Sequence, residues 1–206
     1  MTSIRIYVNF MAKIITIAHQ KGGVGKSTLA LNLAYSFGRN VRTALTDTDP
    51  QGSIVQLQEI ATGIDILPYE RHTLQSDYDV IFVDTPPYII ETMRPIFLQS
   101  DLVIIPTKAG VPDIMAIRAT IDLVKEVQQE KKYLKACIVL NMVKSRANIT
   151  EQAREQLQVY DLPILAEIKD RVSYTNTFLT GGIHAGNDEA AKQEVEELTK
   201  QILELL

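Results

Sequence analysis

Residues Lys21 to Thr28 read Lys-Gly-Gly-Val-Gly-Lys-Ser-Thr, and this octet decides the fold that we expect for the chain. Three glycines within four positions let the backbone curl until several N–H groups converge on one point, an arrangement that suits a polyphosphate. The apolar run Ile14–Ala18 before the octet is typical of a buried strand, and the residues after it have helical character. The octet therefore has the strand-loop-helix context that a phosphate-binding loop requires.

The octet departs from the ordinary phosphate-loop pattern G-x-x-x-x-G-K-[ST] at one position. That pattern requires glycine where this chain has Gln20, and a second lysine, Lys21, stands five residues before Lys26. Lys26 brings a positive charge to the β- and γ-phosphates, and Ser27 brings a hydroxyl for Mg²⁺. Because backbone N–H groups at a helix N-terminus attract anions, the helix that follows adds to the same site.

Composition is ordinary for one globular domain. The 206 residues are 46% hydrophobic and 22% charged, long enough for one α/β domain and too short for two. The first ten residues lack the apolar core and cleavage site of a secretory signal, so we expect a cytoplasmic protein. We expect residues 1–10 to be an N-terminal extension before a domain at 11–206; an added edge strand over Ile4–Val8 is the alternative.

Apolar runs alternate with helical patterns along the whole chain, which predicts a mostly parallel sheet of about seven strands with helices on both faces. The expected strands are Ile14–Ala18, Val41–Thr46, Ile64–Leu67, Val80–Val83, Leu102–Ile105, Lys135–Leu140 and Ile164–Glu167. The clearest expected helices are Lys26–Phe37, Pro112–Gln129, Thr150–Val159 and Asp188–Leu206.

Carboxylates follow two of the expected strands. Asp47 and Asp49 come at the end of the second strand, and Asp84 at the end of the fourth. In a parallel sheet, ligands bind outside the carboxyl ends of the strands, where the phosphate loop also lies. Two lysines and three carboxylates are thus expected at one edge of the sheet, as Mg²⁺-nucleotide hydrolysis requires. A single aspartate at a strand end is as often a turn or cap residue as a ligand.

Three motifs in this order resemble the ParA-type partition ATPases of the deviant-Walker MinD/ParA class of P-loop proteins. They are the octet, Asp-Thr-Asp-Pro-Gln-Gly-Ser at residues 47–53, and Val-Ile-Phe-Val-Asp-Thr-Pro-Pro at residues 80–87. The likeness runs from about Met11 to Leu206, and the length is similar to that of the small, ParF-like members. The resemblance implies a single-domain ATPase that uses ATP, ADP and Mg²⁺.

The resemblance also implies roles for the residues of the loop. Lys21 resembles the signature lysine that reaches the phosphates of a partner subunit's ATP, whereas Lys26 corresponds to the lysine that acts within its own subunit. Thr28 corresponds to a contact with the α-phosphate. The remaining loop residues that the resemblance assigns to nucleotide binding are Gly22, Gly23, Val24 and Gly25.

The aspartates take metal and catalytic roles in the same comparison. Ser27 corresponds to a direct Mg²⁺ ligand, Asp84 resembles the Walker B carboxylate that holds Mg²⁺ through water, and Asp47 supports the metal region. Asp49 resembles the residue that positions the attacking water. Asn141, at a strand end, fits the asparagine that reads adenine, and Pro106 lies where the family lines the base pocket, although both residue types have common structural explanations.

For function, the resemblance implies a slow ATPase with weak basal activity that forms a homodimer with ATP. Hydrolysis by such a switch drives segregation of a plasmid or chromosome region. The ATP dimer is expected to bind DNA nonspecifically, and a DNA-binding or cargo adaptor protein, ParB-like or ParG-like, is expected to stimulate hydrolysis. The sequence does not name the cargo.

The charge pattern bears on these partners. With a net charge of −4, DNA binding needs a local basic patch. Two clusters qualify, although a solvated helix face explains either one equally well. They are Lys125, Lys131, Lys132 and Lys135, followed by Lys144, Arg146 and Arg154.

Other readings stay open. The main alternative is a MinD-like or cargo-positioning ATPase that acts on a protein assembly or a membrane surface. Residues 187–206 carry six acidic residues against two lysines, which anionic lipid would repel, so we expect no membrane contact. Iron–sulfur proteins of this fold need clustered cysteines, and Cys137 is the single cysteine. A module that binds nucleotide without hydrolysing it is a further alternative.

Overall fold

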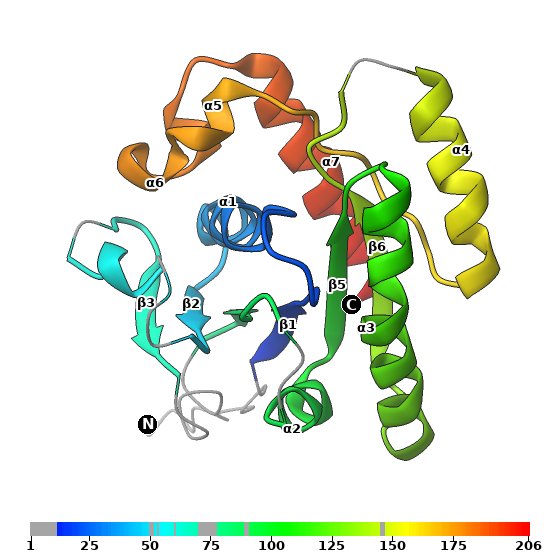
Figure 1. Cartoon of the computed structure of the whole chain (residues 1–206). Coiled ribbons are helices and arrows are strands. Elements are labelled where there is room, and N and C mark those ends of the chain that lie inside the picture. Colours follow the sequence, from blue (N-terminus) through cyan, green and yellow to red (C-terminus); the bar gives the residue numbers. More distant parts are fainter. Residues whose placement is uncertain are drawn as a thin grey trace, which may run out of the picture.

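The computed structural model of the protein describes residues 12–49, 52, 54–59, 61–69, 78–88, 91–144 and 147–206. Within these residues strands and helices alternate along the chain, as the apolar runs predict (Figure 1). The strands are β1 (Lys13–Ile17), β2 (Thr43–Asp47), β3 (Asp65–Pro68), β4 (Val80–Asp84), β5 (Leu102–Thr107) and β6 (Lys135–Leu140). The longer helices are α1 (Lys26–Gly38), α2 (Met93–Gln99), α3 (Val111–Glu130), α4 (Ala147–Leu157) and α7 (Glu189–Leu205). The short helical turns are η1 (Val55–Leu57), η3 (Gln158–Tyr160), α5 (Val172–Thr175), α6 (Thr177–Thr180) and η4 (Ile183–Ala185).

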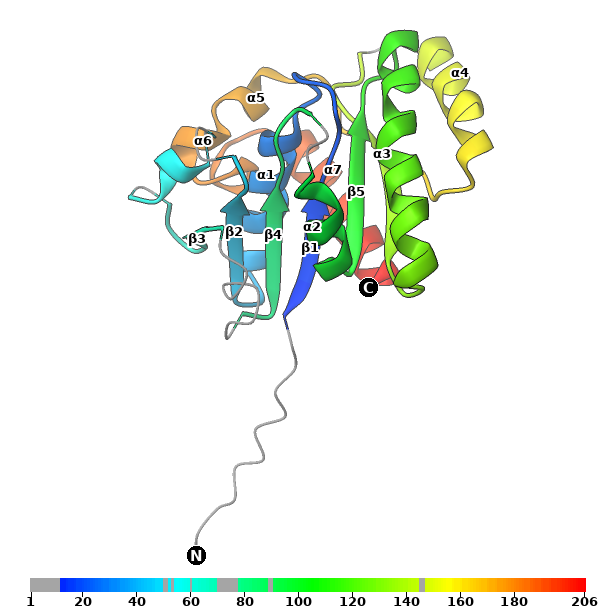
Figure 2. The ribbon, with the colours of Figure 1, turned by 60° about the horizontal axis from the view of Figure 1, so that its bottom comes forward.

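The described strands form one six-stranded sheet in the order β3-β2-β4-β1-β5-β6. Every neighbouring pair is parallel, so all carboxyl ends point to one edge of the sheet. Figure 2 shows the strand arrowheads directed to this edge, where α5 and α6 also lie. Strand β1 is central, with the chain moving to β2 on one side and later to β5 on the other, which creates a topological switch point beside β1.

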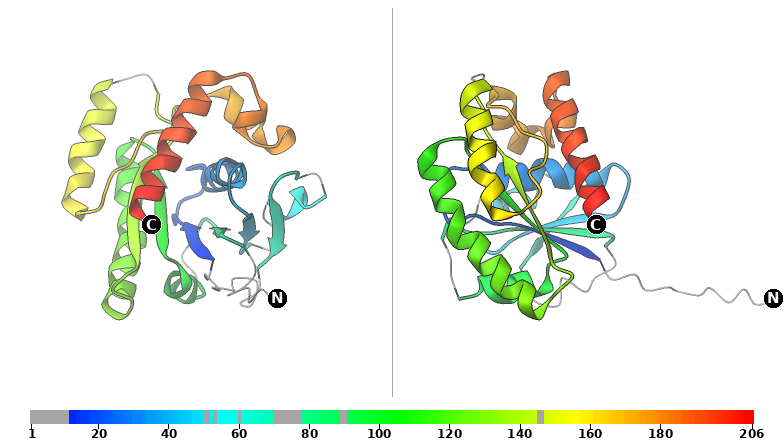
Figure 3. Two further views of the ribbon diagram at one scale, coloured as in Figure 1. Left: turned by 180° about the vertical axis from the view of Figure 1, so that it is seen from behind. Right: turned by 90° about the vertical axis from the view of Figure 1, so that its right-hand side faces the viewer.

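Helices cover both faces of the sheet, and alternate residues of the central strands supply the two cores. Ile15 and Ile17 of β1 pack with α1 and α7 on one face. Ile14 and Ala18 pack on the other face, in the core to which α2, α3 and α4 contribute. The layers are seen from two further directions in Figure 3. Because both faces are buried, the strands read as continuous apolar runs rather than as alternating ones.

The prediction of a seventh strand at Ile164–Glu167 is wrong. The segment runs beside β6 but makes only isolated bridges, such as Ile138 with Ile164. Leu165 N donates to Ile138 O, but the next ladder bond to Leu140 O comes from Ile168 rather than from residue 167. The extra residue is a bulge that interrupts the ladder and turns both Leu165 and Ile168 into the α1–α7 core.

The expected helices form within a few residues of their predicted bounds, and the sequence reasoning missed α2, α5 and α6. These three span at most seven residues, which is too short for a helical period to stand out. Residues 1–10 lie outside the described residues, so the extension and the alternative edge strand both stay predictions. Of the helices that the structure describes, none is both long and apolar enough to cross a bilayer.

Candidate functional site

The carboxylates that follow the strands lie side by side, as their positions predict. Asp47 and Asp84 are register partners across β2 and β4, and Asp84 is also the register partner of Ile17 at the end of β1. Thr48 joins the two strand ends, because its N–H and its hydroxyl both donate to the Asp84 carbonyl at 3.0 Å. Three strand ends therefore deliver the phosphate loop and both aspartates to the same point.

The backbone of the octet curls through the left-handed region at two glycines, Gly23 (φ 72°) and Gly25 (φ 83°). Gly25 is the N-cap of α1 and provides no side-chain cap, and the first turn of α1 holds no acidic residue. The N-terminal N–H groups of α1 are thus left for a ligand, and the helix dipole favours an anion there. A Cβ at Gly25 would also lie 2.5 Å from Asn141 Nδ2, so only glycine fits.

A cavity of about 350 Å³, which we call the loop cavity, opens between the octet and the two strand ends. Lys26 reaches into it with 7% of the residue exposed, and burial lowers the pKa of its ammonium group. Its Nζ atom lies 3.4 Å from the Lys21 carbonyl. The loop cavity is lined by Gly22, Gly23, Gly25, Lys26, Ser27, Thr28, Asp47, Asp49, Gly52, Asp84, Thr85, Pro86, Pro87 and Phe178.

The floor of the loop cavity fits a divalent cation. Asp47 Oδ2 and Asp84 Oδ1 are buried without a hydrogen-bond partner, and the Ser27 hydroxyl bonds to Asp84. Burial raises the pKa of Asp84 to about 7, although the Ser27 hydrogen bond and the Lys26 charge act in the opposite direction. Burial also raises the pKa of Asp47. The described residues form no cluster of three or more His, Cys, Asp or Glu, so phosphate oxygens and water would complete an octahedral Mg²⁺ shell.

Asp49 lies at the same cavity, as its motif predicts. Its backbone N–H donates to Asp47 Oδ1 at 2.9 Å, which holds the turn after β2 against the neighbouring aspartate. Gly52 stands so close to Asp47 that any side chain there would collide with the Asp47 carboxylate. Three other residues of this motif, at positions 50, 51 and 53, lie outside the described residues.

Lys21 points away from the loop cavity and does not line it. Its Nζ atom forms an ion pair of 2.7 Å with Asp113 in the first turn of α3. Gln20, where the ordinary pattern has glycine, donates to the Ala116 carbonyl at 2.6 Å and so ties the loop to α3. Buried His19 accepts the Lys21 N–H at Nδ1 (2.8 Å), and burial together with the nearby Lys26 charge lowers the pKa of His19 to about 4, so the ring is neutral.

A second cavity of about 310 Å³, which we call the C-terminal cavity, continues from the loop cavity. The two share Gly25, Thr28 and Phe178. Asn141, for which the resemblance implies contact with adenine, lines the C-terminal cavity, and its Nδ2 donates to the Val24 carbonyl at 2.8 Å and so supports the octet. Pro106 is placed differently from the prediction of a pocket position: it is buried within β5 as the register partner of Val139, and it lines neither cavity.

The sequence reasoning missed most of the C-terminal cavity. The overlooked wall comes from α1, from Met142 after β6, from the segment that follows the bulge together with its short helices α5 and α6, and from α7. One signal was available: Asn32 interrupts the buried apolar run of α1, and a buried amide needs partners. The overlooked lining residues are Leu29, Asn32, Met142, Ile168, Lys169, Asp170, Arg171, Tyr174, Thr175, Phe178 and Val195.

The two candidate basic clusters come from different elements: the first from α3 through the start of β6, and the second from the segment after β6 and from α4. In the first cluster Lys131 donates to the Ser100 carbonyl at 2.6 Å and Lys135 donates to the Leu205 carbonyl. In the second, Arg154 forms an ion pair with Glu167 at 3.9 Å. These contacts support a structural role for three of the basic side chains. Lys125, Lys132 and Lys144 are exposed, and Arg146 lies outside the described residues.

The architecture and the loop define the class of phosphate-loop α/β proteins, and comparison with known proteins identifies the family. Residues 15–181 match the model of the CobQ/CobB/MinD/ParA nucleotide binding domain. The chain belongs to this family, which confirms the resemblance drawn from the three motifs.

Named relatives and a solved structure agree with that assignment. The chain is 26% identical to the maintenance of carboxysome distribution protein A of Halothiobacillus neapolitanus, over 81% of this chain and 84% of that protein. It is 28% identical to the chromosome partitioning protein ParA of Myxococcus xanthus, over 73% of this chain and 72% of that protein. A plasmid partition protein of Borrelia burgdorferi bound to AMPPNP has the same fold, with a TM-score of 0.75, 23% identity, and 95% of this chain and 100% of that chain covered.

Proposed function

We propose that the protein is a Mg²⁺-dependent ATPase in which ATP drives formation of a homodimer and slow hydrolysis ends that state. The loop cavity binds the phosphates, and the C-terminal cavity holds the nucleoside. Support comes from the uncapped N-terminus of α1, from buried Lys26, and from two buried carboxylate oxygens without partners. The Borrelia burgdorferi protein of the same fold was solved with AMPPNP, which agrees with an adenine nucleotide as the ligand.

The position of Lys21 is the main observation that supports the proposed homodimer. Its ammonium group is held on α3 by Asp113, outside its own loop cavity, so the cavity of a single chain lacks this second cation. The residues on either side of Asp113 expose apolar surface, with Val111 57% and Met115 72% exposed. A second copy that packs against this face would cover the apolar side chains and bring its own Lys21 to the phosphates.

Each residue then has a part in hydrolysis. Lys26 binds the β- and γ-phosphates, Ser27 and the aspartates Asp47 and Asp84 hold the metal, and Asp49 orients the attacking water. Bound Mg²⁺ supplies charge neutralisation between the phosphates. Lys21 of the second copy adds a cation where charge develops on the γ-phosphate oxygens, so the reaction depends on dimer formation.

The trans role of Lys21 is tested with Lys21→Ala. Binding of MgATP should stay near the wild-type level, because Lys26 and the loop backbone are untouched. Hydrolysis should fall about 100-fold, the size typical of losing one charged donor in a transition state. Steady-state phosphate release and equilibrium ATP binding measure the two effects, with exposed Lys125→Ala as the matched lysine control.

Mixing two defective variants separates action in trans from action in cis. A Lys21→Ala chain keeps Asp49, and an Asp49→Ala chain keeps Lys21. In a mixed dimer the Lys21→Ala cavity receives the lysine of the other chain, so mixing should restore part of the hydrolysis. Activity that stays at the level of the separate variants would refute the trans role.

The relatives support a proposal for the cargo that the protein moves. Partition of a DNA element is favoured, with an adaptor that stimulates hydrolysis and with nonspecific DNA binding by the ATP dimer. The carboxysome distribution relative supports the second candidate, positioning of a protein assembly. An ATP-dependent and salt-sensitive shift of random-sequence DNA supports nucleoid attachment in either case; retention on anionic liposomes instead would favour a membrane-cycling switch.

A further inference from the structure

The wall of the C-terminal cavity includes two very short helices that need anchors from elsewhere. We call residues Arg171–Thr180 the cap; it contains α5 and α6, which have four residues each. Tyr174, Thr175 and Phe178 of the cap line the C-terminal cavity, and Phe178 also lines the loop cavity. Helices of one turn are not stable by themselves, so contacts to neighbouring elements must set the position of the cap.

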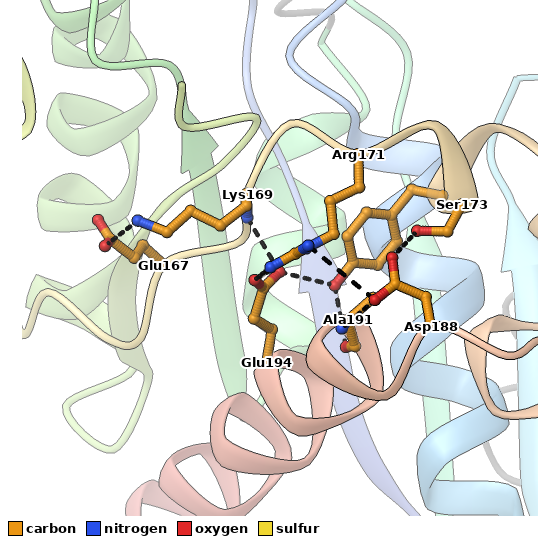
Figure 4. Close-up of polar contacts among 8 residues, drawn as sticks. Glu167, Lys169, Arg171, Ser173, Asp188, Ala191 and Glu194 are labelled. Atoms are coloured by element: carbon orange, nitrogen blue, oxygen red, sulfur yellow. Dashed lines mark hydrogen bonds and ion pairs between the residues drawn. The ribbon is translucent and has the colours of Figure 1, made fainter. Parts of the chain in front are cut away.

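The first anchor is α7 (Figure 4). Arg171 donates to Glu194 Oε1 at 2.6 Å, and Ser173 donates to Asp188 at 2.8 Å. The Tyr174 hydroxyl lies 3.1 Å from the Ala191 carbonyl. These bonds hold the α5 end of the cap to the N-terminal part of α7.

The second anchor is Asn32 of α1, which is 1% exposed. Its Nδ2 group donates to the Thr28 carbonyl at 2.8 Å and to Thr177 Oγ1 at 3.1 Å. Its Oδ1 atom accepts the Ile183 N–H at 2.8 Å. Both amide donors and the acceptor are therefore engaged, and one side chain joins the first turn of α1 to the start of α6 at Thr177 and to the start of η4 at Ile183.

We propose that Asn32 is a positioning residue that couples the two cavities, so that phosphates bound in the loop cavity stabilise the cap in the position where it lines the C-terminal cavity. Thr28 lines both cavities and is bonded directly to Asn32, so a ligand that orders the first turn of α1 also orders the attachment point of the cap. Coupling of this kind is reciprocal: the nucleoside also strengthens phosphate binding. The inference rests on the proposed nucleotide binding.

The test compares two ligands that differ by the nucleoside alone, MgADP and magnesium pyrophosphate, by calorimetry on the full chain. The ratio of their affinities reports what the adenosine part adds. In Asn32→Leu, which keeps the branching of the side chain at Cγ but none of the three hydrogen bonds, this ratio should fall about tenfold. Thr177→Val removes one of the three Asn32 bonds, together with the bond from the Thr177 hydroxyl to the Tyr174 carbonyl inside the cap, and should lower the ratio about threefold.

Ser36→Ala is the matched control. Ser36 lies one turn further along α1, is also buried, and bonds to Thr199 of α7 at 2.9 Å, but it lines neither cavity. The ratio should keep its wild-type value in this variant. If Asn32→Leu does not fold, Thr177→Val decides the question against the same control.

The outcomes separate the two claims. If the wild type binds both ligands and the variants weaken both to the same extent, the coupling is overturned while nucleotide binding stands. An unchanged ratio in the variants overturns the coupling as well. If the wild type binds neither MgADP nor pyrophosphate, the proposed ATPase function fails and the inference falls with it.

Discussion

The loop cavity and the C-terminal cavity share Gly25, Thr28 and Phe178. Their walls differ in whether the charged side chains have partners within the protein. In the loop cavity, Asp47 and Asp84 each keep a buried carboxylate oxygen without a partner. In the wall of the C-terminal cavity, both basic side chains are paired within the protein: Lys169 lies 2.5 Å from Glu167, and Arg171 lies 2.6 Å from Glu194.

This difference distinguishes charged groups that can bind a ligand from charged groups that stabilise the fold. An unpaired buried carboxylate costs stability, and a bound cation offsets that cost while the carboxylate stays ionised, which suits the loop cavity to ligand binding. The pairs behind the C-terminal cavity are complete without a ligand and mainly hold the cap in place. Substitutions in the two walls should therefore differ in their effects on protein stability and on the affinities for MgADP and magnesium pyrophosphate.

The largest effect is expected from Asp84→Asn. Burial raises the pKa of Asp84 from 3.8 to about 7, so the folded protein binds a proton that the unfolded chain releases between these pH values. The wild type should therefore lose unfolding free energy as pH rises from 4 to 8, by up to about 4 kcal/mol at ~1.4 kcal/mol per pKa unit. The asparagine variant avoids this loss, so at pH 8 it should be more stable but unable to hydrolyse ATP.

Denaturant titrations in EDTA across this pH range provide the measurement. Near pH 4 the two proteins should have similar stability, because Asp84 is then protonated in the folded state. Added Mg²⁺ at pH 8 should stabilise the wild type and leave the variant unchanged. Parallel stability profiles from pH 4 to pH 8 would show that Asp84 is neutralised by another group and would remove the contrast between the cavities.

A smaller effect is expected from Gly25→Ala, at the boundary of the two cavities. The new Cβ would lie 2.5 Å from Asn141 Nδ2 and would strain a backbone at φ 83°. Affinity for MgADP and for magnesium pyrophosphate should fall together, each about 100-fold, because steric and backbone strain of this kind costs about 3 kcal/mol. Gly23→Ala is the control, since Gly23 has φ 72° but open space around its Cα, and its loss should be about tenfold or less. Equal losses in both variants would show that backbone strain alone matters.

The smallest effect is expected from Glu194→Gln, behind the C-terminal cavity. Loss of the charge weakens the bonds to Arg171, so the cap is held less firmly. MgADP affinity should fall about fivefold, as expected for a partly buried pair worth about 1 kcal/mol, while pyrophosphate affinity stays constant. Glu189→Gln, in the exposed pair with Lys192 on the same helix, should change neither affinity. A loss of pyrophosphate binding in Glu194→Gln would contradict the division between the two walls.

The loop cavity was predictable because each of its parts comes from a short, continuous stretch of sequence. A glycine-rich turn follows one buried run, and aspartates follow two others. Parallel strands bring such ends together whatever packs around them, and the register of Asp47 with Asp84 confirms this. The seventh strand failed because a one-residue bulge after Leu165 leaves the same apolar pattern in the sequence as a regular strand does.

The C-terminal cavity was not predictable in this way. Its cap has no helical period, and its anchors join residues far apart in the sequence, such as Asn32 with Thr177, 145 residues later. Likewise, the octet identifies Lys21 as unusual, but its ion pair with Asp113 depends on where α3 packs.

The sequence by itself determined the phosphate loop, the parallel sheet and the carboxylates at its edge, because residue type and strand direction decide each of them locally. Only the tertiary structure decided the shape of the C-terminal cavity and the direction in which the Lys21 side chain points. Those features arise from side chains that meet only after α3, the cap and α7 have packed against the sheet, and no local pattern records such contacts.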